Sequence, residues 1–199
     1  MRGAVGAIIL VCVAVFLLQQ AIGPDALAFL TLSPGSQFRP WQLVTYAFIH
    51  EGWTHLIFNM FALYVFGRHL ESVWGSTRFT IFYLACVISA AATQLATQHL
   101  SVDYAQAQTA GASGGVFGVL LAFAMFFPRE RIIILPIPIP MPAWLFVTLY
   151  AGLELFFGVT GTQSGVAHFA HLGGMLGAAV LLLYDKFSPA NRTPLRPPG

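Results

Sequence analysis

Long apolar runs alternate with short polar stretches along this chain, and six of the runs approach the length of a membrane-crossing helix. Within the runs the apolar residues are continuous and do not alternate with polar ones, so helices are favoured over the strands of a barrel. A helical span needs about 20 apolar residues. The pattern predicts an all-α, polytopic membrane protein with six transmembrane helices, at about 4–22, 54–70, 77–98, 113–127, 142–160 and 166–184.

The composition supports a membrane environment, because 57% of the residues are hydrophobic and only 8% are charged. A soluble domain carries about 25% charged residues. The six helices are expected to form one domain, 1–187, followed by a disordered cytoplasmic Pro-rich tail, 188–199. The first run extends to Ile22 and is expected to be a span, in preference to a cleaved signal peptide.

The cationic side chains are distributed unequally between the two sides of a six-span arrangement. Arg39 alone falls on one side, and by the positive-inside rule the other side, with both termini, is cytoplasmic. The proline-rich stretch 132–142 on that side must be extended. The long outer loop 23–53 is rich in aromatic residues suited to the membrane interface. Two roles remain for it: anchoring in the interface, or control of access to a site. The cytoplasmic cations are Arg2, Arg68, Arg78, Arg129, Arg131, Lys186, Arg192 and Arg196.

Several polar side chains are expected at one depth inside the bundle. Three spans enter from the outer side, and they begin with Ser113, with the pair His55 and Asn59, and with the pair His168 and His171. Polar residues within spans are expensive and tend to mark functional sites. The span that begins at Ser113 is about 22 Å long against a core of about 30 Å, so its N-terminus should be recessed and able to bind an oxyanion.

Small residues at four-residue spacing predict close contact between two of these helices. If those faces meet, Ser113 and His171 come within reach of each other. The pairs are Gly114 with Gly118, Gly173 with Gly177, and Gly174 with Ala178.

The same residues allow other interpretations. Ser113 could be only a helix N-cap, and the soluble-hydrolase elbow GxSxG is rejected because no buried strand precedes it. His50 and His55 are one residue too far apart for a zinc-protease HExxH motif, so no metal is expected. Glu154, the only carboxylate well inside a span, supports an alternative, a small polytopic transporter or channel that uses Glu154 and the intramembrane histidines.

A carboxylate partner for His171 is not expected. Asp25, Glu51 and Asp103 lie in outer loops, and no spacing ties any of them to His171. A serine hydrolase built on these residues should therefore use a Ser–His catalytic dyad.

In combination these motifs resemble the rhomboid intramembrane serine proteases of the minimal six-helix, prokaryotic type. Residues 111–114 match the family motif GxSG, residues 170–178 are similar to AHxxGxxxG, and residues 55–59 match HxxxN. The resemblance covers nearly the whole chain. It implies a serine-type endopeptidase, a hydrolase without cofactors, that performs intramembrane proteolysis on transmembrane protein substrates in the lipid bilayer and binds no nucleic acid.

The resemblance also implies roles for individual residues. Ser113 would be the nucleophile and His171 the general base and acid, while His55, Asn59 and the Ser113 backbone N–H would hold the oxyanion. The supporting residues would be Gly111, Gly114, Phe117 and Gly174.

Two positions depart from the family pattern. Gln42 follows Trp41 where many members have arginine, and Phe117 replaces a tyrosine that some members stack on the catalytic histidine. The expected location is a prokaryotic plasma membrane, with the active site opening outward.

Overall fold

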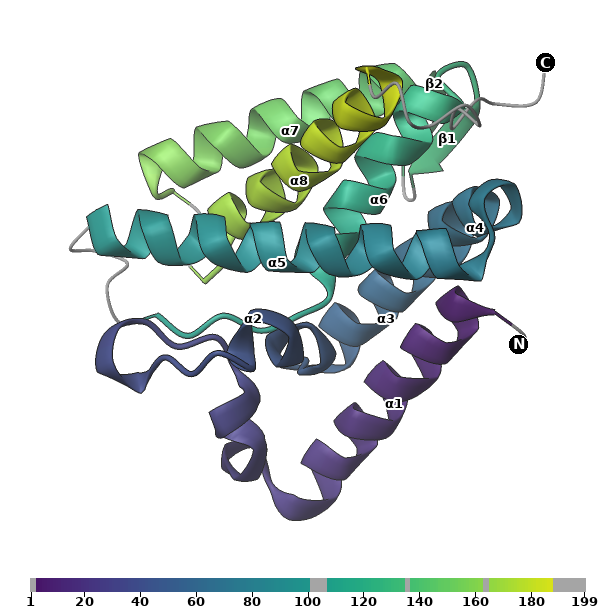
Figure 1. Cartoon of the computed structure of the whole chain (residues 1–199). Helices are drawn as coiled ribbons and strands as arrows, with labels where there is room; N and C mark the ends of the chain where they lie inside the picture. The colour runs from purple at the N-terminus through teal and green to yellow at the C-terminus, as the bar shows by residue number, and fades with distance from the viewer. Residues whose placement is uncertain (1–2, 101–106, 135–136, 163–164, 188–199) are drawn as a thin grey trace.

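The computed structural model describes residues 3–100, 107–134, 137–162 and 165–187. A long central helix, α5, separates two groups of helices (Figure 1). One group holds the helices that follow α5 in the chain, and the other holds those that precede it. The helices are α1 (Ala4–Ile22), α3 (Trp53–Ala62), α4 (Arg68–Trp74), α5 (Ser76–Leu100), α6 (Ser113–Phe126), α7 (Ala143–Thr160) and α8 (His168–Phe187).

The connection between α3 and α4 is itself helical. A π-helical turn, η4 (Leu63–Gly67), joins them, so the backbone is helical from residue 53 to residue 74. Such turns insert an extra residue into an α-helix. This helix occupies the range where the sequence predicts a single span, 54–70.

The remaining elements are short. The segment between α1 and α3 contains η1 (Pro24–Leu30), η2 (Gly35–Gln37), α2 (Gln42–Thr45) and η3 (Tyr46–Phe48). Between α6 and α7, β1 (Arg131–Ile134) pairs antiparallel with β2 (Ile137–Pro142). The prolines of this segment therefore lie in extended backbone, as the sequence predicts, because proline cannot continue a helix.

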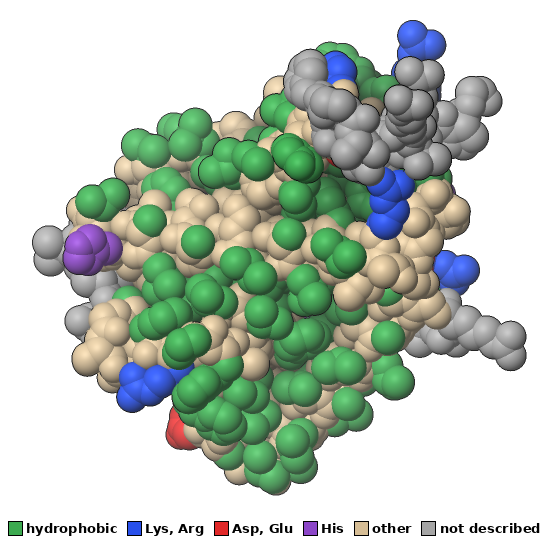
Figure 2. Space-filling model, in the orientation of Figure 1, with side chains coloured by type: hydrophobic (Ala, Val, Ile, Leu, Met, Phe, Trp, Pro, Cys, Tyr) green, Lys and Arg blue, Asp and Glu red, His purple; other side chains and the backbone are tan. Residues whose placement is uncertain are grey.

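Three helices, α1, α5 and α7, are long and apolar enough to cross a membrane, and α6 is apolar but shorter, with 14 residues. Hydrophobic side chains also spread over the surface of the molecule (Figure 2). The chain is thus an all-α, polytopic integral membrane protein. The count of six crossings stays a prediction, and the tail 188–199 lies outside the described residues.

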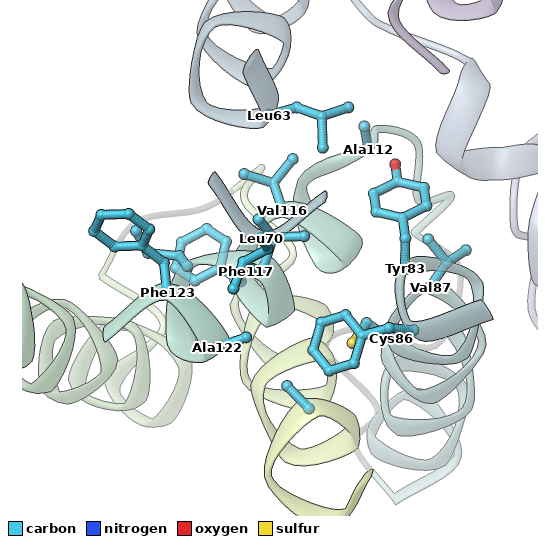
Figure 3. Packing of buried hydrophobic residues seen from close by; sticks show 14 of the residues in the cluster. Leu63, Leu70, Tyr83, Cys86, Val87, Ala112, Val116, Phe117, Ala122 and Phe123 are labelled. Carbon is cyan, nitrogen blue, oxygen red and sulfur yellow. The ribbon is translucent and has the colours of Figure 1, made fainter. Parts of the chain in front are cut away.

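Helix α6 forms the centre of the hydrophobic core. Its side chains are buried along nearly its whole length, against α5 on one side and the η4–α4 segment on another. Figure 3 shows this packing around Val116 and Phe117. The neighbouring core residues that the view labels are Leu63, Leu70, Tyr83, Cys86, Val87, Ala112, Ala122 and Phe123.

Helices α6 and α8 approach each other at glycine. A β-carbon on Gly174 would lie 1.8 Å from the carbonyl oxygen of Gly114, so no side chain fits there. Gly173 and Gly177 face α5 instead, where a β-carbon would meet Thr93 and Ser89 at 2.5 and 2.6 Å. Of the two glycine faces of α8 that the sequence suggests, only the one containing Gly174 meets α6.

Candidate active site

Ser113 is the first residue of α6, and the N-cap position belongs to Ala112 without a capping side-chain hydrogen bond. The N-cap interpretation of Ser113 is therefore wrong. Its hydroxyl instead meets an imidazole of α8, because Nε2 of His171 lies 2.8 Å from Ser113 Oγ. This contact brings together two residues 58 positions apart in the chain.

The backbone before Ser113 is held by the segment between α1 and α3. Gly111 has φ 122°, a conformation that L residues rarely adopt, and its N–H donates to the Tyr46 carbonyl oxygen at 3.0 Å. Two residues earlier, Thr109 and Leu32 exchange both backbone hydrogen bonds at 2.9 Å. The loop 23–53 thus positions the backbone that leads into Ser113, which its composition alone does not reveal.

An aromatic ring fixes the plane of His171. The Phe117 ring stacks on the imidazole with centroids 4.2 Å apart and an angle of 7° between the planes. Phe117 also contacts Tyr150 of α7 at 4.9 Å. The aromatic stack that the sequence suggests for Phe117 is therefore present without a hydroxyl group.

Glu154 lies within a helix, as the sequence predicts, but it contacts a residue that the sequence did not pair with it. Its Oε2 lies 2.9 Å from Nδ1 of His171 and 2.6 Å from Nδ1 of His168, and all three side chains are buried. The expectation that no carboxylate reaches His171 is therefore wrong. A signal was available: a short connection joins the helices of Glu154 and His171, and both residues lie a few positions from it.

Glu154, His168 and His171 are also residues of the types that bind metal ions, and their ligand atoms lie within 4.8 Å of one another. A tetrahedral zinc ion with ligands at 2.0–2.1 Å would separate the ligand atoms by about 3.3 Å. The observed N–O separations of 2.6 and 2.9 Å are instead those of hydrogen bonds. The arrangement fits a shared carboxylate acceptor better than a metal centre.

The two predicted oxyanion residues lie on α3 and occupy different surroundings. His55 Nε2 is beside the loop before Ser113, since a β-carbon on Gly111 would lie 2.6 Å from it and 3.7 Å from Ser113 Oγ. Asn59 is buried, and its amide donates to the His55 carbonyl oxygen at 2.9 Å. His55 therefore lies next to Gly111, whereas the Asn59 side chain hydrogen-bonds to the backbone of its own helix.

His50 packs beside His55, with ring centroids 5.2 Å apart. Burial, with a smaller effect from neighbouring His55, lowers the pKa of His50 to about 4. His50 is therefore neutral at pH 7, and its uncharged ring packs against the ring of His55. This agrees with a structural role for His50.

The fold and the site together define a helical membrane protein in which a half-buried serine contacts a buried histidine. Residues 37–186 match the Rhomboid domain. This match covers more than half of the chain, which belongs to the rhomboid family.

Individual relatives agree with this assignment. The chain is 32% identical over 131 residues to "Rhomboid protein 1, mitochondrial" of Saccharomyces cerevisiae, covering 65% of this chain and 37% of that protein. It is 31% identical over 141 residues to "Putative rhomboid protease YdcA" of Bacillus subtilis, covering 71% and 65%. It is 25% identical over 186 residues to "Rhomboid protease GlpG" of Pectobacterium atrosepticum, covering 92% and 63%. The chain spans less than two thirds of the length of each.

Proposed function

We propose that this chain is an intramembrane serine endopeptidase that cleaves transmembrane segments of other proteins. The observation that carries the proposal is the 2.8 Å contact between Ser113 Oγ and His171 Nε2 inside a membrane protein of this family. The printed names of relatives as rhomboid proteases support it. The transporter alternative rested on Glu154 and the histidines, which instead bond to one another beside Ser113.

In the proposed reaction, Ser113 Oγ attacks a peptide carbonyl carbon while its proton passes to His171 Nε2. The same proton then moves to the leaving amine, and an acyl-enzyme remains. Water then attacks the acyl carbon while His171 takes its proton, and His171 returns that proton to Ser113 Oγ as the new carboxyl product leaves. The stack with Phe117 supports this assignment because it limits rotation of the imidazole.

The developing oxyanion needs donors at the N-terminus of α6. The first N–H groups of a helix lack partners within the helix, and the partial positive charge of that end favours an anion. The Ser113 N–H is one such group, and His55 is a second donor near Gly111. Asn59 is the third candidate, through the amide hydrogen that does not bond to His55. Each donor is worth about 3 kcal/mol in the transition state.

The substrates in this proposal are membrane-spanning helices. A peptide bond within a helix is shielded by the helix's own hydrogen bonds, so small and helix-breaking residues should favour cleavage. No cofactor takes part in these steps.

We further propose that both termini are cytoplasmic and that the site opens outward in a prokaryotic plasma membrane. The cationic side chains support this orientation: in Figure 2 they gather mainly near the α4–α5 turn and the β-hairpin. An ion pair between Arg78 and Asp185, at 3.6 Å, joins the start of α5 to the end of α8 on that same side.

The proposal is tested with a model transmembrane substrate in proteoliposomes and with a fluorophosphonate probe. Ser113→Ala should abolish both cleavage and labelling, because no other group in the proposed reaction can form the acyl-enzyme. Gel analysis of the products and fluorescence of the labelled band measure the two effects. Cleavage by Ser113→Ala at the rate of the unaltered protein would refute the function.

A further inference from the structure

We infer that Glu154 is a positioning residue for His171, so that the site is a hydrogen-bonded Ser113–His171–Glu154 triad in which His168 secures the carboxylate. This inference rests on the proposed function and deepens it, since it concerns the same reaction. The juxtaposition that carries it is a single carboxylate oxygen, Glu154 Oε2, within hydrogen-bond distance of both imidazoles.

The contacts assign the hydrogen on each imidazole. An ionised carboxylate only accepts hydrogen bonds, so Nδ1 of His171 and Nδ1 of His168 each carry the hydrogen that bonds to Glu154. This leaves the lone pair of His171 Nε2 directed at Ser113 Oγ, 2.8 Å away. A general base requires this tautomer, and the opposite tautomer would present an N–H to the serine.

The carboxylate also matches the charge that the reaction creates. When Ser113 gives up its proton, His171 becomes an imidazolium within a buried site. Only 5% of Glu154 is exposed, so its charge acts at 2.9 Å with little screening by water. A buried carboxylate without partners would be strongly destabilised, and the second donor, His168, reduces that penalty.

The packing of α7 on α8 holds this geometry. Gly158 lies one helical turn after Glu154, and a β-carbon there would be 3.2 Å from the β-carbon of His168. The Phe157 ring lies 5.8 Å from the His168 ring. Close approach at Gly158 therefore sets the distance from which the carboxylate reaches both histidines.

The test compares the same substitution at two carboxylates. Glu154→Gln keeps the side-chain size but removes the charge and allows the amide to donate to His171, which favours the wrong tautomer. The control is Glu71→Gln, because Glu71 accepts hydrogen bonds from the Ala4 N–H and the Ser76 hydroxyl and so has a structural role. Both variants are prepared as the full chain, checked for folding by size exclusion and thermal unfolding, and assayed in proteoliposomes.

For Glu154→Gln we expect kcat to fall roughly 10²- to 10⁴-fold. KM should stay within about threefold of the original value, because Glu154 bonds to Nδ1 of His171, whereas Nε2 is the nitrogen that faces Ser113. The second-order rate of fluorophosphonate labelling at Ser113 should fall in parallel, which separates serine activation from substrate entry. Glu71→Gln should lower the unfolding temperature and leave kcat of the folded protein unchanged.

A folded Glu154→Gln variant with undiminished kcat overturns the inference. If that variant does not fold, Glu154→Asp takes its place: a kcat lowered at least threefold at constant KM supports the positioning role, and an unaltered kcat overturns it. The two proposals fail differently. Activity in Ser113→Ala removes the protease function, whereas an inactive Ser113→Ala beside a fully active Glu154→Gln removes only the role of Glu154.

Discussion

Helices α6 and α7 supply opposite ends of the proposed triad, and they differ most in their surroundings. Nearly every side chain of α6 is buried. Helix α7 is buried only along one narrow stripe, which consists of Ala143, Val147, Glu154 and Gly158. The nucleophile is therefore fixed by the core of the molecule, while the carboxylate arrives from a helix whose other faces are exposed.

This difference shows that a fully buried helix and a largely exposed helix can each contribute a polar side chain to the same site. On α6 a polar group is tolerated at the helix N-terminus, where the chain enters the core. On α7 the polar group lies in mid-helix, and its two histidine partners on α8 make it tolerable. The comparison can be tested by disturbing the α6–α8 contact, the imidazole stack and the exposed face of α7 in turn.

The largest effect is expected where α6 and α8 touch. In Gly174→Ala the new β-carbon would lie 1.8 Å from the Gly114 carbonyl oxygen, so the two helices must separate. We expect a loss of stability of about 3 kcal/mol or more. A displacement of the site by about 1 Å reduces activity by a further factor of about 10². Thermal unfolding in detergent and cleavage in proteoliposomes measure both effects.

An unaltered unfolding temperature and cleavage rate for Gly174→Ala would show that α6 and α8 are not in backbone contact, and the position of His171 would then need another explanation.

The importance of this glycine contact could be anticipated from sequence, and so could the contact between Ser113 and His171. The run 4–22 coincides with α1, and the short apolar run after Ser113 is α6. The sequence pairs Ser113 with His171 because both lie near the start of predicted spans that enter from the same side. The position of a residue within an apolar run indicates its depth in the membrane, and Ser113 and His171 are predicted at the same depth.

The partner of His171 could not be found in the same way, because a pattern along one helix does not specify which neighbour it faces. Glu154 was visible as an isolated carboxylate, yet its rotation toward α8 depends on tertiary packing at Gly158. The bond from Asn59 to its own helix, and the support of Gly111 by Tyr46, likewise depend on contacts that no local pattern encodes.

A smaller effect is expected from the stack on His171. Phe117→Leu retains an apolar side chain but removes the ring that lies 4.2 Å from the imidazole. Aromatic pairs of this kind contribute about 0.5–1.5 kcal/mol, so kcat should fall by a factor of about 2 to 12. The matched control is Phe123→Leu, about 15 Å along α6 from Ser113, where the ring contacts Phe66 and His69. Equal kcat values for the two variants would remove Phe117 from the orientation of His171.

The smallest effect is expected on the exposed face of α7. Gly152→Ala places a methyl group where nothing lies within 4 Å among the described residues, in contrast to Gly174. Alanine favours a helix over glycine by about 1 kcal/mol, so the unfolding temperature should be equal or slightly higher and cleavage unchanged. Cleavage assays across a series of substrates provide the measurement. A selective loss with some substrates would mean that this face of α7 contacts the substrate helix as well as lipid, and the contrast between α6 as catalytic core and α7 as a carrier of Glu154 would then be too simple.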